Sequence, residues 1–411
     1  MSLTLANAGG FDLPQFMTSM TVIFVIIHML LGAAAYLIYM ERKVVSYIQD
    51  RMGPTRVGPL GLLQPIADGL KLFFKEDFIP KGADKTLFIL APVLTVMPAL
   101  VSFAVIPWAE PLDLSTIPFL DLTGTVAIAG ADVNIGIVYL LATASLGVYG
   151  VSLGGWASNN KYSFLGGLRA TAQMISYEIP MGVTLLCVIL LAGSIHPTEI
   201  AQSQIDGMWN LFHHPIAAII FYTCLLAEAN RAPFDLAEAE SELVGGWHTE
   251  YSSMKWALFF MGEYVNLCVG SAFFALMFMG GWSVNPLPFG PDLTGSGALW
   301  LLPLQFGVMA GKIFLLIFLT MMIRWTLPRF RFDQLMRLAW EGMIPASLFV
   351  LMVTSVMVYF GWTGWMWLAS LGCLVALYVI YPHIPRQSDP NHRIPLVGSR
   401  FSPVRAGEPG A

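Results

Sequence analysis

Acidic side chains are concentrated in one segment, residues 228–255, that lies between two apolar runs. Only two cations, Arg231 and Lys255, accompany these acids. Like charges that are buried together repel one another, and this repulsion raises their proton affinity. The segment also carries large apolar residues, including Phe234 and Trp247, so we expect it to fold back into the protein. It is therefore a candidate for a role in proton transfer or beside a cofactor. Its acids are Glu228, Asp235, Glu238, Glu240, Glu242 and Glu250.

Three further ionisable residues, Glu178, Glu263 and Lys312, lie inside apolar runs. A charge at mid-membrane costs roughly 3 kcal/mol, and such residues are functional candidates by default. With a rise of about 1.5 Å per residue, Glu178 lies about one turn inside its run, Glu263 about 12 Å and Lys312 about 18 Å. In one interpretation, Lys312 and a glutamate form a static pair that holds helices together. The pattern favours the other, a line of protonatable groups leading inward from the acidic segment, with Pro180 opening the helix locally for water.

The elements that must position these residues are apolar runs, most of them close to the ~20 residues of a spanning helix. Hydrophobic residues make up 56% of the chain and charged residues 11%, whereas a soluble domain has about 25% charged residues. A soluble globular fold is thereby excluded. We predict an all-α polytopic membrane protein with about nine transmembrane helices. The runs are 20–40, 86–106, 133–153, 174–192, 215–228, 255–279, 299–323, 345–360 and 362–381, of which 215–228 is short for a span.

The cations define the orientation. When the runs are threaded alternately, all of the 21 Lys and Arg residues except Lys312 fall on one side. The positive-inside bias makes that side cytoplasmic, or the matrix side in an organelle. We expect a bacterial inner (plasma) membrane protein with its N-terminus outside and its C-terminus in the cytoplasm. The opposite segments carry carboxylates, among them Asp132 and Glu199. No basic cluster suggests nucleic acid, and no basic residue precedes the first run, so that helix is expected to be retained.

One transmembrane helical domain, 1–381, is expected, with a loosely ordered cytoplasmic tail at 382–411. Three cytoplasmic segments, 41–85, 229–254 and 324–344, are too long to be connectors. The first contains an amphipathic helix that is too polar to span, so it should lie along the membrane surface. It either seals the bundle or forms a wall of a lipid-accessible cavity. Its apolar face is Leu62, Leu63, Ile66, Leu70, Phe73 and Phe74, and its polar face is Gln64, Asp68, Lys71 and Lys75.

Cysteine and histidine usage argues against a redox metal. The cysteines stand alone in apolar runs without the C-x-x-C spacing of an iron–sulfur or zinc site; they are Cys187, Cys224, Cys268 and Cys373. A transmembrane b-type haem would take His from two helices, whereas only His28 lies well inside a run. We therefore expect no metal bound by this chain.

Several stretches together resemble one family. They are 51–71, 228–235 (Glu-Ala-Asn-Arg-Ala-Pro-Phe-Asp), 240–244, 250–253 and 328–336. They are similar, in order, to the H-type membrane subunit (mitochondrial subunit 1) of proton-pumping NADH–quinone oxidoreductase, respiratory complex I. The resemblance runs from about 41 to 345. The sequence departs from the family pattern in the acidic segment at Ala229, Ala237, Ala239 and Trp247-His248, and also at Glu341.

The resemblance implies a specific role. Such a subunit anchors the hydrophilic arm, helps to form the chamber that admits quinone as substrate, and binds neither metal nor flavin itself. Its partners are the other membrane and hydrophilic-arm subunits, including the one with the terminal iron–sulfur cluster, together with membrane lipid. The residues that match the chamber and acidic loop are Arg51, Asp68, Arg231, Asp235, Glu238, Glu240 and Glu242. Those that match the proton route are Asp132, Glu178, Glu228 and Glu263.

Two alternatives stay open. The chain could be the equivalent subunit of a related complex-I-like dehydrogenase that takes electrons from another donor, because the donor is chosen by other subunits. A stand-alone ion transporter could use the same buried acids. It would be active as a purified chain, whereas the subunit would not.

Overall fold

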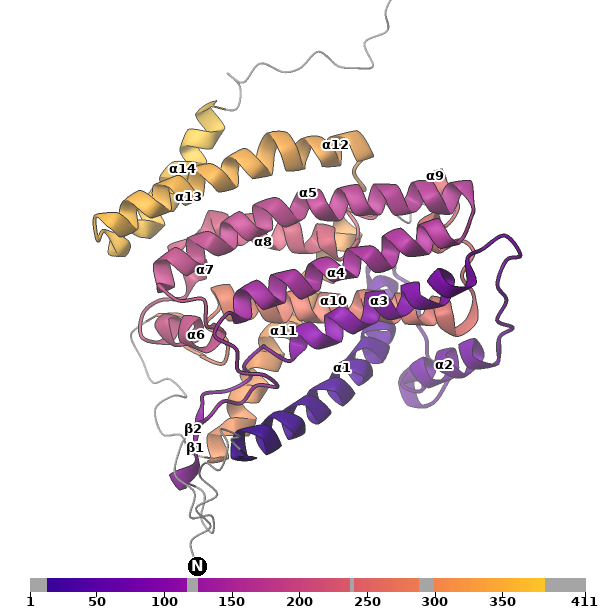
Figure 1. Cartoon of the computed structure of the whole chain (residues 1–411), viewed down its shortest axis with the longest axis horizontal. Coiled ribbons are helices and arrows are strands. Elements are labelled where there is room, and N and C mark those ends of the chain that lie inside the picture. The colour runs from indigo at the N-terminus through magenta and orange to yellow at the C-terminus, as the bar shows by residue number, and fades with distance from the viewer. Residues whose placement is uncertain (1–12, 117–124, 237–239, 288–298, 381–411) are drawn as a thin grey trace, which may run out of the picture.

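The computed structural model describes residues 13–116, 125–236, 240–287 and 299–380, and these form a helical bundle (Figure 1). Seven of its helical stretches are long and apolar enough to cross a membrane. They are α1 (Leu13–Ile48), α3 (Lys85–Phe103), α4 (Gly136–Ala157), α5 (Lys161–Ala192), α10 (Ser253–Phe278), α11 (Leu302–Thr326) and the continuous stretch Phe332–Tyr359. That stretch joins α12 (Phe332–Arg337), a π-helical segment (Leu338–Met343) and α13 (Ile344–Tyr359). Two shorter apolar helices, α8 (Pro215–Glu228) and α14 (Met366–Ile380), complete the set, so the prediction of an all-α polytopic membrane protein is confirmed.

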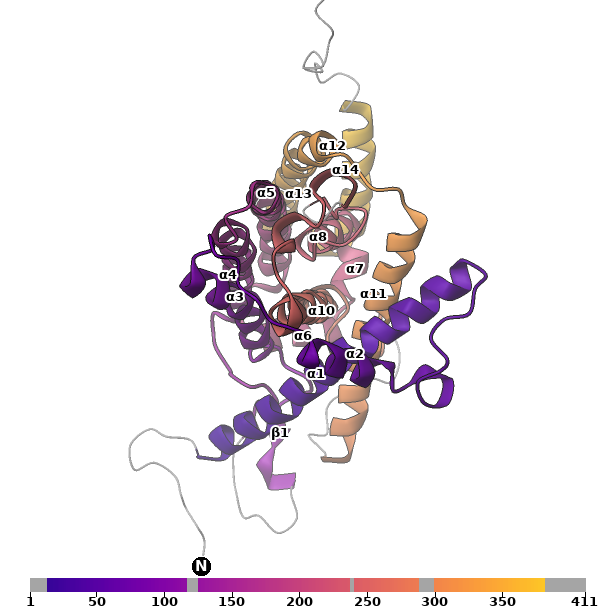
Figure 2. The same cartoon turned by 90° about the vertical axis from the view of Figure 1, so that its right-hand side faces the viewer.

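Helix α10 lies near the centre of the bundle, with α3 and α4 on one side and α11 on the other (Figure 2). In its most apolar window 61% of the residues are buried, against 22% for α1, which lies at the periphery. Close approach of α3, α4 and α5 depends on small residues. A Cβ on Gly150 of α4 would lie 2.1 Å from Thr95 Oγ1 of α3, and one on Gly155 would lie 2.6 Å from the Ser163 carbonyl oxygen of α5. Glycine therefore lets these backbones pack where any side chain would separate them.

The two ends of the bundle differ. At one end lie α2 (Gln64–Phe74), α9 (Glu240–Leu243) and α12, all on the side predicted to be cytoplasmic (Figure 1). At the other end lie α6 (Pro197–Ile205), α7 (Asn210–His213) and an antiparallel ribbon of two short strands, β1 (Leu112–Asp113) and β2 (Thr125–Val126). The ribbon is the only strand structure in the described part of the chain.

Several predicted boundaries need correction, although 215–228 coincides with α8. Helix α1 continues past the predicted end at 40 to Ile48, and α5 begins at Lys161 instead of 174. The start of α5 is fixed by Asn160, whose side chain accepts a hydrogen bond from the Tyr162 amide at 2.9 Å. Hydropathy ends a run at the first charges, whereas the helix continues as long as its backbone bonds are made. Pro180 does not interrupt α5.

The amphipathic helix is confirmed as α2, preceded by a tight turn. Gly61 in that turn has φ +85°, and a Cβ there would lie 2.2 Å from the Pro54 carbonyl oxygen. The apolar side chains of α2 point outward, since Phe73 is 67% and Phe74 80% exposed. This orientation suits a helix whose outer face meets lipid.

Candidate functional site

Buried charges from four separate segments meet at the predicted cytoplasmic end of the bundle. Arg231, which follows α8, places its guanidinium 3.3 Å from Glu263 of α10 and 3.9 Å from Glu41 of α1. Arg324 of α11 forms a salt bridge with Glu41, and the Tyr264 hydroxyl donates to the same carboxylate. Glu41 is 7% and Arg231 5% exposed. A buried charge is tolerated only when it is paired, so these groups form one interdependent network, called here the Glu41 cluster.

Aromatic rings cover the central cation of the Glu41 cluster. The Arg231 guanidinium lies 4.3 Å from the centre of the Tyr264 ring and 5.9 Å from that of Phe260. Cation–π attraction adds to the ion pairs and is strongest where water is excluded. The cluster includes two residues of the predicted site, Arg231 and Glu263, and several that sequence reasoning missed. Glu41 and Arg324 were missed because each directly follows the end of an apolar run, although α1 and α11 continue through them, and Tyr264 was missed because a tyrosine inside such a run is not ionisable near neutral pH.

The acidic segment folds back into the protein, as its apolar residues predict. Phe234 is 2% and Trp247 1% exposed. Its start is attached to α5 by Gln173, whose amide donates to the carbonyl oxygens of Ala227 at 2.8 Å and Phe234 at 2.7 Å. The same amide also donates to the Asn230 side chain, and together these bonds fix the chain direction after α8. The described part of the segment is therefore packed into the protein around Phe234 and Trp247, whereas Glu242 and Val244 are exposed.

Asp235 is a buried acid of this segment. Its Oδ2 accepts a hydrogen bond from Arg329 at 3.0 Å, whereas Oδ1 has no partner within the described residues. Burial raises the pKa of Asp235 to about 6, although the nearby Arg329 and Arg324 act in the opposite direction. Asp235 therefore titrates close to physiological pH.

The other acids of the segment are placed differently. Glu242 pairs with Arg169 of α5 at 2.5 Å on the surface, and Glu250 accepts from Asn160 at 2.6 Å. Neither belongs to the Glu41 cluster. Glu238 lies outside the described residues, as does the side chain of Glu240, the first residue of α9.

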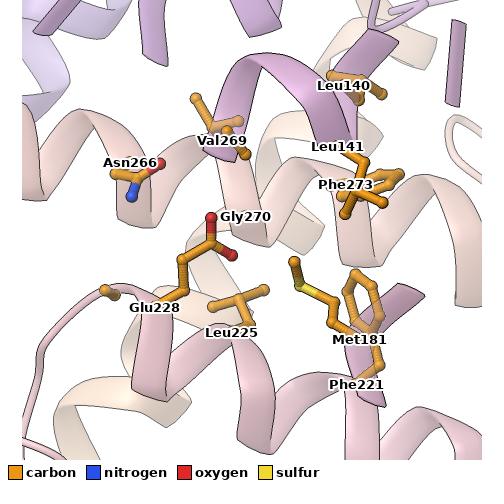
Figure 3. A pocket seen from close by; sticks show the side chains of 12 residues that line it. Leu140, Leu141, Met181, Phe221, Leu225, Glu228, Asn266, Val269, Gly270 and Phe273 are labelled. Carbon is orange, nitrogen blue, oxygen red and sulfur yellow. The ribbon is translucent and has the colours of Figure 1, made fainter. Parts of the chain in front are cut away.

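Glu178 and Glu228 form a second acidic group, deeper in the bundle. The Ser145 hydroxyl of α4 donates to the Glu178 carboxylate, and the charge of Glu178 acts electrostatically on Glu228. The Glu228 carboxylate points into a small cavity between α4, α5, α8 and α10 (Figure 3). Asn266 of α10 lies on the same side of this cavity. Two predicted route residues are thus neighbours here.

Asp132 is not brought together with the other predicted route residues. It precedes α4 at the end of the bundle that holds α6, where its Oδ1 lies 2.9 Å from Nε2 of His196. Ser145, which contacts Glu178, lies nine residues further along α4 than Gly136, a rise of about 13 Å. Lys312 also belongs to that end: its ammonium donates to the carbonyl oxygens of Met279, Gly281 and Ser283, which follow α10, and lies 4.3 Å from the centre of the Trp209 ring.

A larger cavity of about 270 Å³ opens between α1, α2 and α10. Its lining is mostly apolar, with Arg42, Gln64 and Asp68 as the charged or amide groups. Arg42 and Asp68 form a salt bridge at 2.6 Å, and Gln64 donates to Asp68 at 2.9 Å. Phe260 lines this cavity, and its ring also lies beside the Arg231 guanidinium, so this residue connects the cavity with the Glu41 cluster. Arg51 does not line the cavity; it is exposed and donates to the Gln49 side chain at 2.8 Å.

The described residues contain no group of three or more His, Cys, Asp or Glu side chains that could hold a metal ion. The cysteines are buried and separate. The acidic side chains described above can hold and transfer protons, and they lie near a mostly apolar cavity that has a few polar groups.

Comparison with known proteins agrees with this chemistry. The family described as NADH dehydrogenase matches residues 20–355. The chain is 46% identical to the first of the H-type subunits of NADH-quinone oxidoreductase in Geobacter sulfurreducens, over 85% of this chain and 97% of the relative. It is 48% identical to the second H-type subunit of the same enzyme in Koribacter versatilis, over 81% and 94%, and 45% identical to the H-type subunit of Rhodospirillum rubrum, over 84% and 95%. The chain therefore belongs to the family of the H-type subunits of NADH-quinone oxidoreductase, which are membrane subunits of respiratory complex I.

Proposed function

We propose that this chain forms part of the quinone chamber and couples quinone reduction to proton translocation. The observation that carries the proposal is the shared wall between the 270 Å³ cavity and the Glu41 cluster. A quinone head group in that cavity would lie beside Phe260, whose ring centre is 5.9 Å from the Arg231 guanidinium of the buried ion pairs. A charge change in the cavity would act on them through protein and not through water, where it would be screened.

Reduction of a quinone to a quinol consumes two electrons and two protons. The electrons must come from a partner subunit of the complex, because the acids and arginines that we assign to the route carry protons and charge but do not transfer electrons. Asp235, with its pKa of about 6, can supply and regain a proton near neutral pH. The exposed loop that carries Arg51 is expected to complete the chamber together with the hydrophilic arm, at the cytoplasmic side of a bacterial inner membrane.

The proposed proton route comprises the Glu41 cluster with Glu263, followed by Glu228 and Glu178. Asp132 lies at the far end of α4 beside His196, and we assign it to the outer end of the route. Glu242 makes a surface pair with Arg169 and has a structural role in this scheme. The cavity itself can admit an isoprenoid quinone from the bilayer because α2 turns Gln64 and Asp68 toward the cavity and leaves Phe73 and Phe74 exposed.

The test uses the assembled enzyme. Glu178→Gln, Glu228→Gln and Glu263→Gln keep shape and remove titration, so each should suppress both quinone reduction and pumping, since a blocked proton step stalls electron flow in a coupled machine. Electron transfer from NADH to ferricyanide should be unchanged. Asp113→Asn and Glu199→Gln, at the opposite end of the bundle, are the matched controls and should pump normally. Full pumping by all three glutamine variants would show that these acids are structural.

The alternatives give different results in one measurement. A particle of several hundred kilodaltons after detergent extraction would exclude a stand-alone transporter. The electron donor is then identified from the other subunits of that particle.

A further inference from the structure

One titratable side chain of α1, His28, lies on the face of this helix that points away from the bundle. Buried residues recur along α1 at steps of three or four, and they are Ile26, Leu30, Ala34 and Leu37. Position 28 falls on the opposite side of the helix, and His28 is exposed. Because α1 runs along the edge of the bundle, His28 lies on the outer surface of this chain (Figure 1).

The same residue lies near the middle of the membrane. The apolar run 20–40 is centred on Leu30, and a separation of two residues corresponds to about 3 Å along a helix. Phe24, one turn earlier on the outward face, is 65% exposed. Lipid hydrocarbon offers no hydrogen-bond partner, and ionisable residues inside spans almost always face protein or a water-filled cavity. An outward-facing imidazole at this depth therefore indicates a protein neighbour.

The hydrogen bonding of His28 defines what that neighbour must supply. Its Nδ1 lies 2.8 Å from the Phe24 carbonyl oxygen. A carbonyl oxygen only accepts, so Nδ1 carries the hydrogen and Nε2 of the neutral ring is left as an acceptor. Nε2 has no partner within the described residues. Thr21, on the same face, differs, because its hydroxyl donates to the Met17 carbonyl oxygen at 2.9 Å.

The space beside His28 allows a helix to approach. Gly32, one turn further along α1, is exposed, and no atom lies within 4 Å of a Cβ built on it. Transmembrane helices associate through small residues that let backbones come close and through hydrogen bonds from polar side chains, His among them. Gly32 supplies the close approach, and Nε2 of His28 supplies the polar contact.

We propose that the outward face of α1 around His28 and Gly32 binds a transmembrane helix of a partner subunit. This helix places a hydrogen-bond donor, the hydroxyl or amide group of a side chain, at Nε2 of His28. The partner is a protein and not lipid, because an acyl chain has no donor for this nitrogen. The contact requires neighbours in the membrane, which membership of the H-type subunit family implies. It takes no part in the proposed proton route, so the two proposals fail separately.

Two substitutions of His28 test the hydrogen bond in the complex purified in detergent. His28→Leu replaces the imidazole with a side chain that suits lipid, and His28→Gln keeps an acceptor oxygen. The amount of each membrane subunit relative to this chain is measured by quantitative mass spectrometry. In His28→Leu, the content of one membrane subunit should fall by about threefold, the size typical of one interhelical hydrogen bond in a membrane. His28→Gln should retain most of that subunit.

A glycine pair tests the close approach. Gly32→Leu leaves the fold of this chain undisturbed, since the site is open, but it holds a neighbouring helix away from α1. It should lower the content of the same subunit as His28→Leu. The matched control is Gly372→Leu on α14, another exposed helical glycine with no atom within 4 Å of a built Cβ. It should leave the subunit content unchanged.

A photo-crosslink identifies what lies against this face. A benzophenone analogue of phenylalanine in place of Phe24, which is exposed one turn from His28, is irradiated in native membranes. The covalent product should contain this chain and the subunit that His28→Leu loses. If His28→Leu prevents assembly altogether, this crosslink in the otherwise native complex decides the question.

Three results would overturn the proposed contact. They are unchanged subunit content in both His28→Leu and Gly32→Leu, equal loss of the same subunit in Gly372→Leu, and crosslinks from position 24 to lipid or quinone alone. None of them bears on the proton route, which is tested by the glutamine variants of the acids. Conversely, loss of a subunit in His28→Leu together with full pumping by all three glutamine variants would support the contact and remove the route.

Discussion

At the scale of single residues, Glu41 and Asp235 differ in how completely their carboxylates are paired. Glu41 has a hydroxyl and two guanidinium groups around it, and removing one partner from such a buried pair costs about 3–5 kcal/mol. The Glu41 carboxylate and the two guanidinium groups therefore hold one another in place. Asp235 differs, because only one of its oxygens has a partner within the described residues and its pKa is raised to about 6. Asp235 should therefore respond to pH.

The pH response of Asp235 has a defined sign. Its pKa in the folded protein lies above the ordinary value of 3.8, so ionisation costs stability; the cost is absent below pH 3.8 and complete above about pH 6. Its size is about 3 kcal/mol, at 1.36 kcal/mol per pKa unit. Asp235→Asn should thus raise the thermal midpoint of the assembled complex, relative to wild type, more at pH 8 than at pH 5. The quinone reductase rate should also lose a transition near pH 6.

Wild-type and Asp235→Asn complexes with parallel pH profiles would contradict this assignment. Asp333→Asn, at an acid in the same cytoplasmic region, is a suitable comparison and should leave the transition in place.

The residue types of the site could be predicted from the sequence, but not all of their partners. A carboxylate inside an apolar run or at its end can be recognised from the amino-acid sequence alone, and Glu178, Glu228 and Glu263 were found in this way. Glu41 and Arg324 lie at run ends, where charges are ordinary, and only the folded chain brings them together. The proximity of Asn266 to Glu228 has no sequence signal at all, because it depends on how α8 and α10 cross.

At the scale of elements, hydropathy located the helices and misplaced several ends. The run 215–228 matches α8 because Pro215 begins the helix and the polar segment begins directly after Glu228. Hydropathy misplaced the start of α5. The first turns of this helix carry Lys161 and Arg169, but they are stabilised by the Asn160 cap and by packing against the acidic segment. A Cβ on Gly166 would lie 2.6 Å from the Trp247 backbone nitrogen, which shows how closely α5 meets that segment. Such contacts are tertiary and cannot be predicted from local composition.

The inner face of α2 offers a direct test of the quinone chamber. Gly69 lines the 270 Å³ cavity, and no atom lies within 4 Å of a Cβ built on it. Gly69→Leu should therefore extend into the cavity without disturbing its neighbours, and it improves helix propensity by roughly 1 kcal/mol. We expect the KM for quinone to rise several-fold or quinone reduction to fall, with NADH to ferricyanide transfer unchanged.

The control is Leu70→Met, on the outer face of the same helix, where the side chain is 53% exposed. It should leave quinone kinetics as in wild type. Unchanged kinetics in Gly69→Leu, in a fully assembled enzyme, would show that the cavity between α1, α2 and α10 does not receive the quinone.

At the scale of the whole molecule, the distribution of surface residues indicates a subunit embedded in lipid and other proteins. Helix α1 and the stretch Phe332–Tyr359 have only 22% of their apolar windows buried within this chain. Phe24 is 65% and Tyr359 85% exposed. Apolar surface of this extent is stable only against lipid or partner helices. The ion pairs of the Glu41 cluster and the Arg329–Asp235 and Arg169–Glu242 pairs lie at one end of the bundle, which matches the side to which the sequence assigns the cations.

The orientation of the chain is the prediction that belongs to this scale. The cation distribution predicts an odd number of spans, because an even number would place cations on both faces. With this odd number, the β1–β2 ribbon lies outside and the tail inside. Ser115→Cys, next to Asp113, and Arg400→Cys, in the tail outside the described residues, test it with a membrane-impermeant maleimide. The described native cysteines are buried and should give little background. Intact cells should label only Ser115→Cys, and inverted vesicles only Arg400→Cys. Labelling of both from the same side would require an even number of spans, and would place either the ribbon or the tail on the wrong face of the membrane.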